Sequence, residues 1–80
     1  MFHIGDKVIW QNPEYDLDLT VEQLIEKHGM RNAGEVVAVY PDDCSVFFPM
    51  LDYGRGSTYT YSNRMLRLMN PIFKDPDWIL

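Results

Sequence analysis

The side chains best suited to catalysis in this chain are two histidines and one cysteine. His3 and His28 are far apart in the sequence, so each is expected to be a surface or hydrogen-bonded histidine rather than a base or a metal ligand. Cys44 directly follows two aspartates, whose negative charge disfavours the thiolate that a cysteine nucleophile needs. The sequence therefore predicts no enzyme, no catalytic residue, no metal site and no cofactor.

A different kind of chemistry, binding through arginine and tyrosine, is concentrated in residues 53–67. The predicted partner-binding residues are three arginines and three tyrosines in a segment without an acidic residue: Tyr53, Arg55, Tyr59, Tyr61, Arg64 and Arg67. Guanidinium groups pair with carboxylates or phosphates, and tyrosine rings stack on bases or add apolar contact area. Because a net charge of −5 weakens binding to polyanions, we expect a protein partner and keep single-stranded nucleic acid as the alternative.

The tyrosines of this segment also have a structural interpretation. Hydroxyl and aromatic side chains alternate in residues 57–61, as in a strand with two unlike faces, and we expect Tyr59 and Tyr61 to face inward. A domain this small needs aromatic rings in its core. The sequence leaves open whether the aromatic residues belong to the core or to a binding groove.

The acidic residues are concentrated earlier in the chain. Residues 1–52 hold ten acidic and three basic residues, a formal charge of −7. Such a stretch is usually a solvated face. An alternative interpretation is a decoy that occupies a basic site on another protein, as an inhibitor would. The residues of this alternative acidic surface are Glu14, Asp16, Asp18 and Glu22.

Composition limits the fold class and the location of the protein. Eighty residues, 46% of them hydrophobic, leave room for one small globular domain. A single cysteine and an N-terminus without the pattern of a signal peptide favour a cytoplasmic location. The apolar run at residues 46–51 is too short to span a bilayer, so we expect no membrane association. The oligomeric state is left open.

One helix is predicted over residues 20–28. Thr20 is a typical N-cap, Gln23 completes a capping box three residues later, and Gly29 ends the helix. The apolar residues Leu17, Val21, Leu24 and Ile25 recur at helical spacing and are expected to share one face. So short a helix is stable only when that face packs against another element.

The rest of the chain reads as short strands separated by turns. The predicted strands are residues 7–10, 35–40, 45–51, 57–61 and 65–69, with a helical turn at 62–64. The predicted core residues lie on one face of each strand in a period-two pattern: Val8, Val36, Ala38, Val46, Phe48, Leu66 and Leu68. We expect the barrel to end near residue 70 and residues 71–80 to form an extended apolar tail, packed on the barrel or on a partner.

This layout resembles the SH3-like barrel, and its short motifs resemble those of KOW-like and Tudor-like small barrels. The motifs that carry the resemblance are Gly5-Asp6-Lys7-Val8, Gly34-Glu35-Val36, Val46-Phe47-Phe48 and Leu66-Arg67-Leu68. The resemblance implies a mainly β, five-stranded SH3-like barrel with one short helix between strands 1 and 2. The resemblance supports a fold more than a function. From the residues themselves we expect a non-enzymatic protein-interaction module, with a KOW-like nucleic-acid-associated factor as an alternative.

The layout is also similar to that of the plasmid-borne type II dihydrofolate reductases, which are SH3-like barrels that work as tetramers. Their Val-Gln-Ile-Tyr substrate-binding run corresponds to Thr58-Tyr59-Thr60-Tyr61, in which Tyr61 matches and the glutamine is absent. The resemblance therefore adds a third alternative, a diverged barrel enzyme that works as an oligomer. It does not imply reductase activity, because the glutamine is absent. Our first expectation remains a small cytoplasmic accessory or regulatory protein, inhibitory if its acidic face is the active one.

Overall fold

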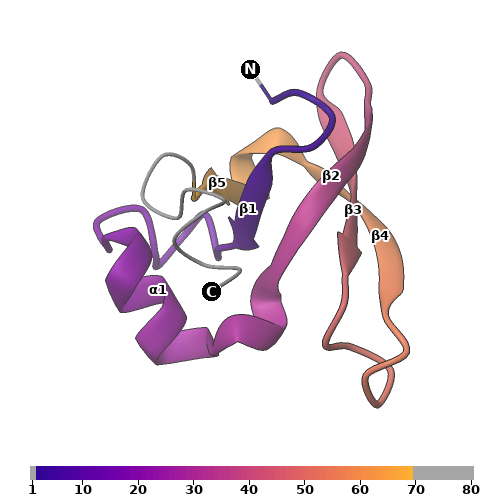
Figure 1. Ribbon diagram of the computed structural model, residues 1–80. Helices are drawn as coiled ribbons and strands as arrows, with labels where there is room; N and C mark the ends of the chain where they lie inside the picture. The colour runs from indigo at the N-terminus through magenta and orange to yellow at the C-terminus, as the bar shows by residue number, and fades with distance from the viewer. Residues whose placement is uncertain (1, 70–80) are drawn as a thin grey trace.

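The computed structural model describes residues 2–69, which form one antiparallel sheet and one α-helix (Figure 1). The elements in chain order are β1 (Lys7–Trp10), α1 (Val21–His28), a 3₁₀ turn (Met30–Asn32), β2 (Ala33–Val39), β3 (Asp43–Phe48), β4 (Ser57–Ser62), a 3₁₀ turn (Asn63–Met65) and β5 (Leu66–Leu68). The strand order is β4-β3-β2-β1-β5. The predicted mainly β class with one short helix is confirmed. The described sheet is open, with β4 and β5 at its two edges.

Buried apolar side chains form two clusters, one on each face of the sheet. The first, which we call the inner cluster, consists of Val8, Val36, Cys44, Val46, Phe48 and Leu66. The second lies under the helix and consists of Ile9, Val21, Leu24, Ala33 and Met69. Because successive side chains of a strand point to opposite faces, β1 supplies Val8 to the first cluster and Ile9 to the second. Both clusters thus meet at β1.

Two of the seven predicted core residues are wrong, and both errors have a local cause. The register between β2 and β3 shifts between Val36 and Ala38, as at a β-bulge, so beyond it Val39 rather than Ala38 packs on the inner cluster. Leu68 is 40% exposed because it ends the three-residue edge strand β5. The other five, Val8, Val36, Val46, Phe48 and Leu66, are buried as expected.

The helix begins and ends at the predicted residues. The Thr20 side chain accepts a hydrogen bond from the Gln23 N–H, and the Gln23 side chain accepts one from the Thr20 N–H. Gly29 ends the helix with φ +83°, a backbone conformation that suits glycine. Val21 and Leu24 are buried, whereas Leu17 is 61% exposed because it precedes the helix, where helical spacing does not apply. The described helix is too short and too polar to cross a membrane.

Replacing Thr20 with alanine is expected to lower the free energy of unfolding by ~1 kcal/mol, since a Gln23 N–H loses its acceptor. Urea unfolding followed by circular dichroism measures this loss. Thr20→Ser, which keeps the hydroxyl, should stay close to the wild type. Equal stability of the alanine and serine variants would contradict the capping role.

Candidate functional site along the edge strand β4

The strand β4 forms one edge of the sheet and pairs with β3 along its whole length. Its six residues, Ser57-Thr58-Tyr59-Thr60-Tyr61-Ser62, include no charge and no proline. At about 3.3 Å per residue the strand is about 20 Å long. Edge strands in most proteins are protected by charge, proline or bulges, because their outward N–H and C=O groups otherwise accept another strand. This edge carries none of these protections.

Aromatic rings form a continuous row beside this edge. Tyr59 and Tyr61 have ring centroids 6.2 Å apart, and the Tyr61 ring lies 6.5 Å from that of Trp10. Phe48 supports both tyrosines from the inner cluster, with centroid distances of 6.3 Å and 6.0 Å. Tyr59 is 48% exposed, while Tyr61 is half-buried. The tyrosines therefore lie on the core face, as predicted, and still leave ring surface open to a partner.

The opposite face of β4 carries hydroxyl groups. Thr60 is paired with Ser45 of β3, and their hydroxyl oxygens are 2.7 Å apart in a hydrogen bond. This cross-strand bond fixes the face that β4 presents, since a slip of one residue would exchange the tyrosine and threonine faces.

Two exposed arginines lie at the ends of β4. Arg55 belongs to the loop before the strand and Arg64 to the 3₁₀ turn after it. In residues 2–69 neither guanidinium group has a hydrogen bond or ion pair. The buried Gln11 holds the 3₁₀ turn Asn63–Met65 in place, because its amide nitrogen donates to the Arg64 carbonyl at 3.0 Å. Both cations are thus positioned by backbone while their side chains remain available.

The loop that carries Arg55 has a defined backbone. Asp52, Tyr53, Gly54 and Gly56 all have positive φ values, and the fully exposed Tyr53 lies in this run. A Cβ on Gly56 would lie 2.3 Å from the Phe47 ring, so this glycine lets the loop pass closely over β3. Tyr53 is therefore a loop-tip residue at the Arg55 end of β4, away from the row of rings.

Arg67 does not belong to this site. Its guanidinium group donates to three backbone carbonyls of the segment before the helix, those of Leu19 at 2.7 Å, Leu17 at 3.2 Å and Asp16 at 3.4 Å. Arg67 is also paired with Ile9, whose side chain lies in the cluster under the helix. Alternation along β5 thus turns Arg67 away from the tyrosine face, and its role is to fasten the loop between β1 and α1.

Acidic residues lie closer to the site than the sequence of residues 53–67 indicates. The Asn63 N–H donates to the Asp42 carbonyl at 2.9 Å, and Asp43 is paired with Ser62 at the end of β4. Strand pairing therefore brings the backbone of Asp42 and Asp43 beside the end of β4, next to the turn that carries Arg64. Since this proximity results from strand pairing, segment composition could not reveal it.

Comparison with protein-family models, with curated proteins and with solved structures found no match.

In the described part of the chain, no group of histidine, cysteine, aspartate and glutamate side chains is arranged to hold a metal ion. Burial raises the pKa of the Cys44 thiol, and the nearby carboxylates of Asp43 and Asp6 raise it further. Its sulfur donates to Asn63 Oδ1 at 3.1 Å.

The predicted acidic surface loses one of its four members. Asp16 is fully buried, with Oδ1 accepting from Lys27 Nζ at 2.5 Å and Oδ2 lying 2.8 Å from both His28 Nε2 and the Asn12 backbone nitrogen. The hydrogen bond from Lys27 holds the pKa of Asp16 well below its usual range, helped by those from Asn12 and His28 and opposed by burial. Asp16 is therefore a structural residue. The exposed residues of this surface are Glu14, Asp18 and Glu22.

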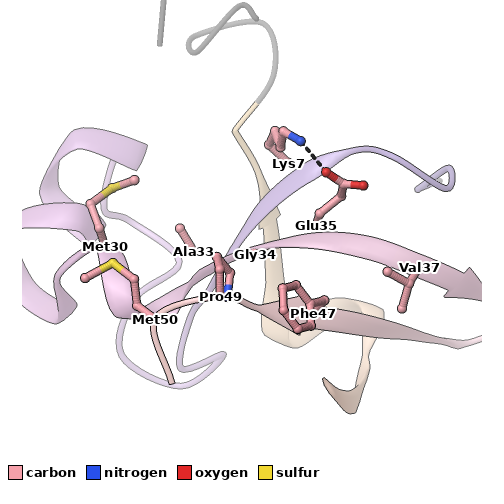
Figure 2. A pocket seen from close by; sticks show the side chains of 9 residues that line it. All are labelled: Lys7, Met30, Ala33, Gly34, Glu35, Val37, Phe47, Pro49 and Met50. Atoms are coloured by element: carbon pink, nitrogen blue, oxygen red, sulfur yellow. Dashed lines mark hydrogen bonds and ion pairs between the residues drawn. The ribbon is translucent and has the colours of Figure 1, made fainter. Parts of the chain in front are cut away.

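A groove lies on the face of the sheet opposite to the inner cluster, and we call it the outer groove (Figure 2). The sequence did not predict it. Its volume is about 390 Å³. Apolar side chains from β2, β3 and the segments flanking them line most of it: Met30, Ala33, Val37, Phe47, Pro49 and Met50. Lys7 and Glu35 lie at one side and form an ion pair. The alternation in β3 places this groove on the face opposite to Tyr59 and Tyr61, since Phe47 points away from Phe48.

Proposed function

We propose that this chain is a non-enzymatic protein-interaction module of the SH3-like type, which binds an extended segment of a partner protein along β4. The observation that carries the proposal is an edge strand without charge or proline, with a row of aromatic rings beside it. At each end lies an arginine whose guanidinium group has no hydrogen bond or ion pair within residues 2–69. The cellular role we propose is that of a small cytoplasmic accessory or regulatory protein.

The strand layout supports the SH3-like part of the proposal. The first strand pairs with both β2 and β5, the longest connection follows β1 and contains the helix, and a 3₁₀ turn directly precedes the last strand. The long first connection and the helical turn before the last strand are among the features on which the sequence analysis based its comparison with small barrels. The described sheet is open, so its closure into a barrel is part of what we propose.

Binding would follow the chemistry of strand addition. A partner segment paired with β4 forms main-chain hydrogen bonds, and every second side chain then lies on the face of Tyr59 and Tyr61. Apolar residues suit those positions, because the half-exposed rings offer contact area there. A carboxylate near the end of the segment would pair with Arg55, whose planar head gives two parallel hydrogen bonds.

The charges near β4 favour a protein over a nucleic acid. A single strand running along this edge would bring a phosphate at every nucleotide, while Asp42 and Asp43 lie at the Arg64 end and the chain carries −5 overall. A protein segment can place one acidic group at the Arg55 end and none beside the aspartates. The proposed partner is therefore acidic at one end of the bound segment rather than along its whole length.

The test is an affinity comparison with a partner recovered from nuclease-treated cytoplasmic extract. Arg55→Ala should weaken binding at least about tenfold, in the range found for anchoring arginines at interfaces. Glu26→Ala is the control, since Glu26 is also a charged, exposed residue but lies on the helix, away from β4 and the Arg55 loop. Both variants should keep the wild-type melting temperature.

Two outcomes of this comparison would contradict the proposal. Equal affinities of Arg55→Ala and Glu26→Ala would exclude the Arg55 end of β4 from the interface. Loss of binding on charge reversal at Glu14 and Asp18, with Arg55→Ala unaffected, would favour the acidic decoy surface instead.

A further inference from the structure

The edge strand β4 is complementary to a second copy of itself. Hydroxyl side chains and tyrosines alternate along Ser57–Ser62 without a charge or a proline. Residues that lie opposite each other in an antiparallel pair share one face of the sheet. A two-fold axis through Thr60 therefore places hydroxyl opposite hydroxyl and ring opposite ring: Thr58 with Ser62, Thr60 with Thr60, and Tyr59 with Tyr61. A symmetric dimer requires a surface that matches itself in this way.

The tyrosine face of β4 gains most from such pairing. Tyr59 is 48% exposed, and its ring lies 6.2 Å from that of Tyr61, with Phe48 behind both. Side chains directly opposite each other across two antiparallel strands have Cβ atoms about 4.5–5.5 Å apart, and aromatic pairs at this distance are stabilising. Pairing of two copies thus covers ring surface that residues 2–69 of one copy leave exposed.

We propose that two copies of this chain associate through antiparallel pairing of their β4 strands about a two-fold axis at Thr60, so that one sheet continues through both. This inference deepens the proposed function and rests on it, because the partner segment uses the same edge. A second copy and the partner therefore exclude each other. Self-pairing covers the edge at high concentrations of the chain and releases it when the partner binds.

The charges at the ends of β4 make this dimer weak. Antiparallel pairing brings the end that carries Arg55 beside the end of the other copy that carries Arg64. Like charges therefore meet at both ends, and each copy also carries −5 overall. Six residues a side form an interface below the roughly 1,200 Å² of stable complexes. A partner segment with a carboxylate at Arg55 meets no such repulsion, so it displaces the second copy.

Sedimentation velocity of the full chain tests the self-pairing. We expect a dissociation constant of about 0.1 mM, so that the chain is largely monomeric near about 10 µM and mostly dimeric near about 1 mM. Thr60→Lys places two lysines opposite each other at the two-fold axis and should weaken association about tenfold or more. Thr60→Asp should do the same, because it also places like charges together. An equimolar mixture of the two variants should associate again, since a lysine then lies opposite an aspartate.

Val37→Lys is the matched control, because Val37 is similarly exposed but lies in β2, which is paired on both sides. This variant should associate like the wild type, and far-ultraviolet circular dichroism checks that every variant is folded. A wild-type chain that stays monomeric near about 1 mM would overturn the proposal. Equal losses from Thr60→Lys and Val37→Lys would do so too, since they would assign the contact to the outer groove. A mixture of the two Thr60 variants that stays monomeric would exclude the two-fold pairing at Thr60.

Arg55→Ala separates this inference from the proposed function, because the two expected effects have opposite signs. Removing the guanidinium group relieves the repulsion between copies, so self-association should strengthen severalfold, whereas partner binding should weaken. Stronger self-association with unchanged partner affinity would contradict the proposed function alone. Weaker partner binding by a chain that does not self-associate would contradict the self-pairing alone.

Discussion

Replacing Phe48 with alanine is expected to leave the protein largely unfolded. Phe48 is 2% exposed and is one of the largest buried side chains, in contact with the rings of Tyr59 and Tyr61. Truncation of a buried phenylalanine costs ~3 to 5 kcal/mol. Domains of this size have a total stability of only about 5 kcal/mol or slightly more. The same change removes the support of the aromatic row, so partner binding should be lost with the fold.

The neighbouring residue provides the control for this prediction. Phe47 points to the opposite face and is 37% exposed, so Phe47→Ala removes the same side chain at far less cost. Thermal and urea unfolding should show a cooperative transition for Phe47→Ala and little folded protein for Phe48→Ala. A Phe48→Ala protein that melts near the wild type would mean that the inner cluster does not hold the sheet together.

The second large effect is expected at Asp16. Its carboxylate satisfies the Asn12 N–H, Lys27 and His28 at a fully buried position, and Asp16→Ala leaves all three without this acceptor. Removing one partner from a buried ion pair costs ~3 to 5 kcal/mol. Because half of the Lys27 side chain is exposed and water can solvate it, we expect about 2 to 3 kcal/mol at neutral pH. Asp18→Ala, at an exposed position two residues away, should cost little.

The contribution of Asp16 to the free energy of unfolding is expected to decrease at acidic pH. The folded protein holds the pKa of this carboxyl below its ordinary value of about 4, so its stabilising contribution is complete above that value and is lost as the pH falls toward the folded-state pKa. The stability difference between the wild type and Asp16→Ala should therefore narrow when urea unfolding is repeated at pH 3. A difference that stays constant between pH 7 and pH 3 would contradict the buried carboxylate network.

Local signals predicted much of the fold. The helix follows from the hydrogen bonds that Thr20 and Gln23 exchange and from Gly29, all of which act within one turn of the chain. The inward orientation of Tyr61 follows from alternation with threonine in a single strand. In these cases the physical cause lies within a few residues, which is why the sequence alone predicts the outcome.

The errors arise where distant segments meet. The bulge that exchanges Ala38 for Val39 depends on the pairing of β2 with β3. Arg67 contacts carbonyls about 50 positions earlier, and the backbone of Asp42 and Asp43 meets the Arg64 end of β4 only through the pairing of β3 with β4. The buried role of Asp16 depends on a hydrogen bond with His28, far from it in sequence. No periodicity or composition reports such contacts.

The most direct test of the account is amide hydrogen exchange of the chain with and without the recovered partner. If an extended segment adds to the edge strand, the outward N–H groups of residues 57–62 become hydrogen-bonded, and their exchange should slow markedly. Exchange in the helix Val21–His28 should change little. Protection confined to residues 14–22, with β4 unaffected, would contradict the account and assign binding to the acidic surface.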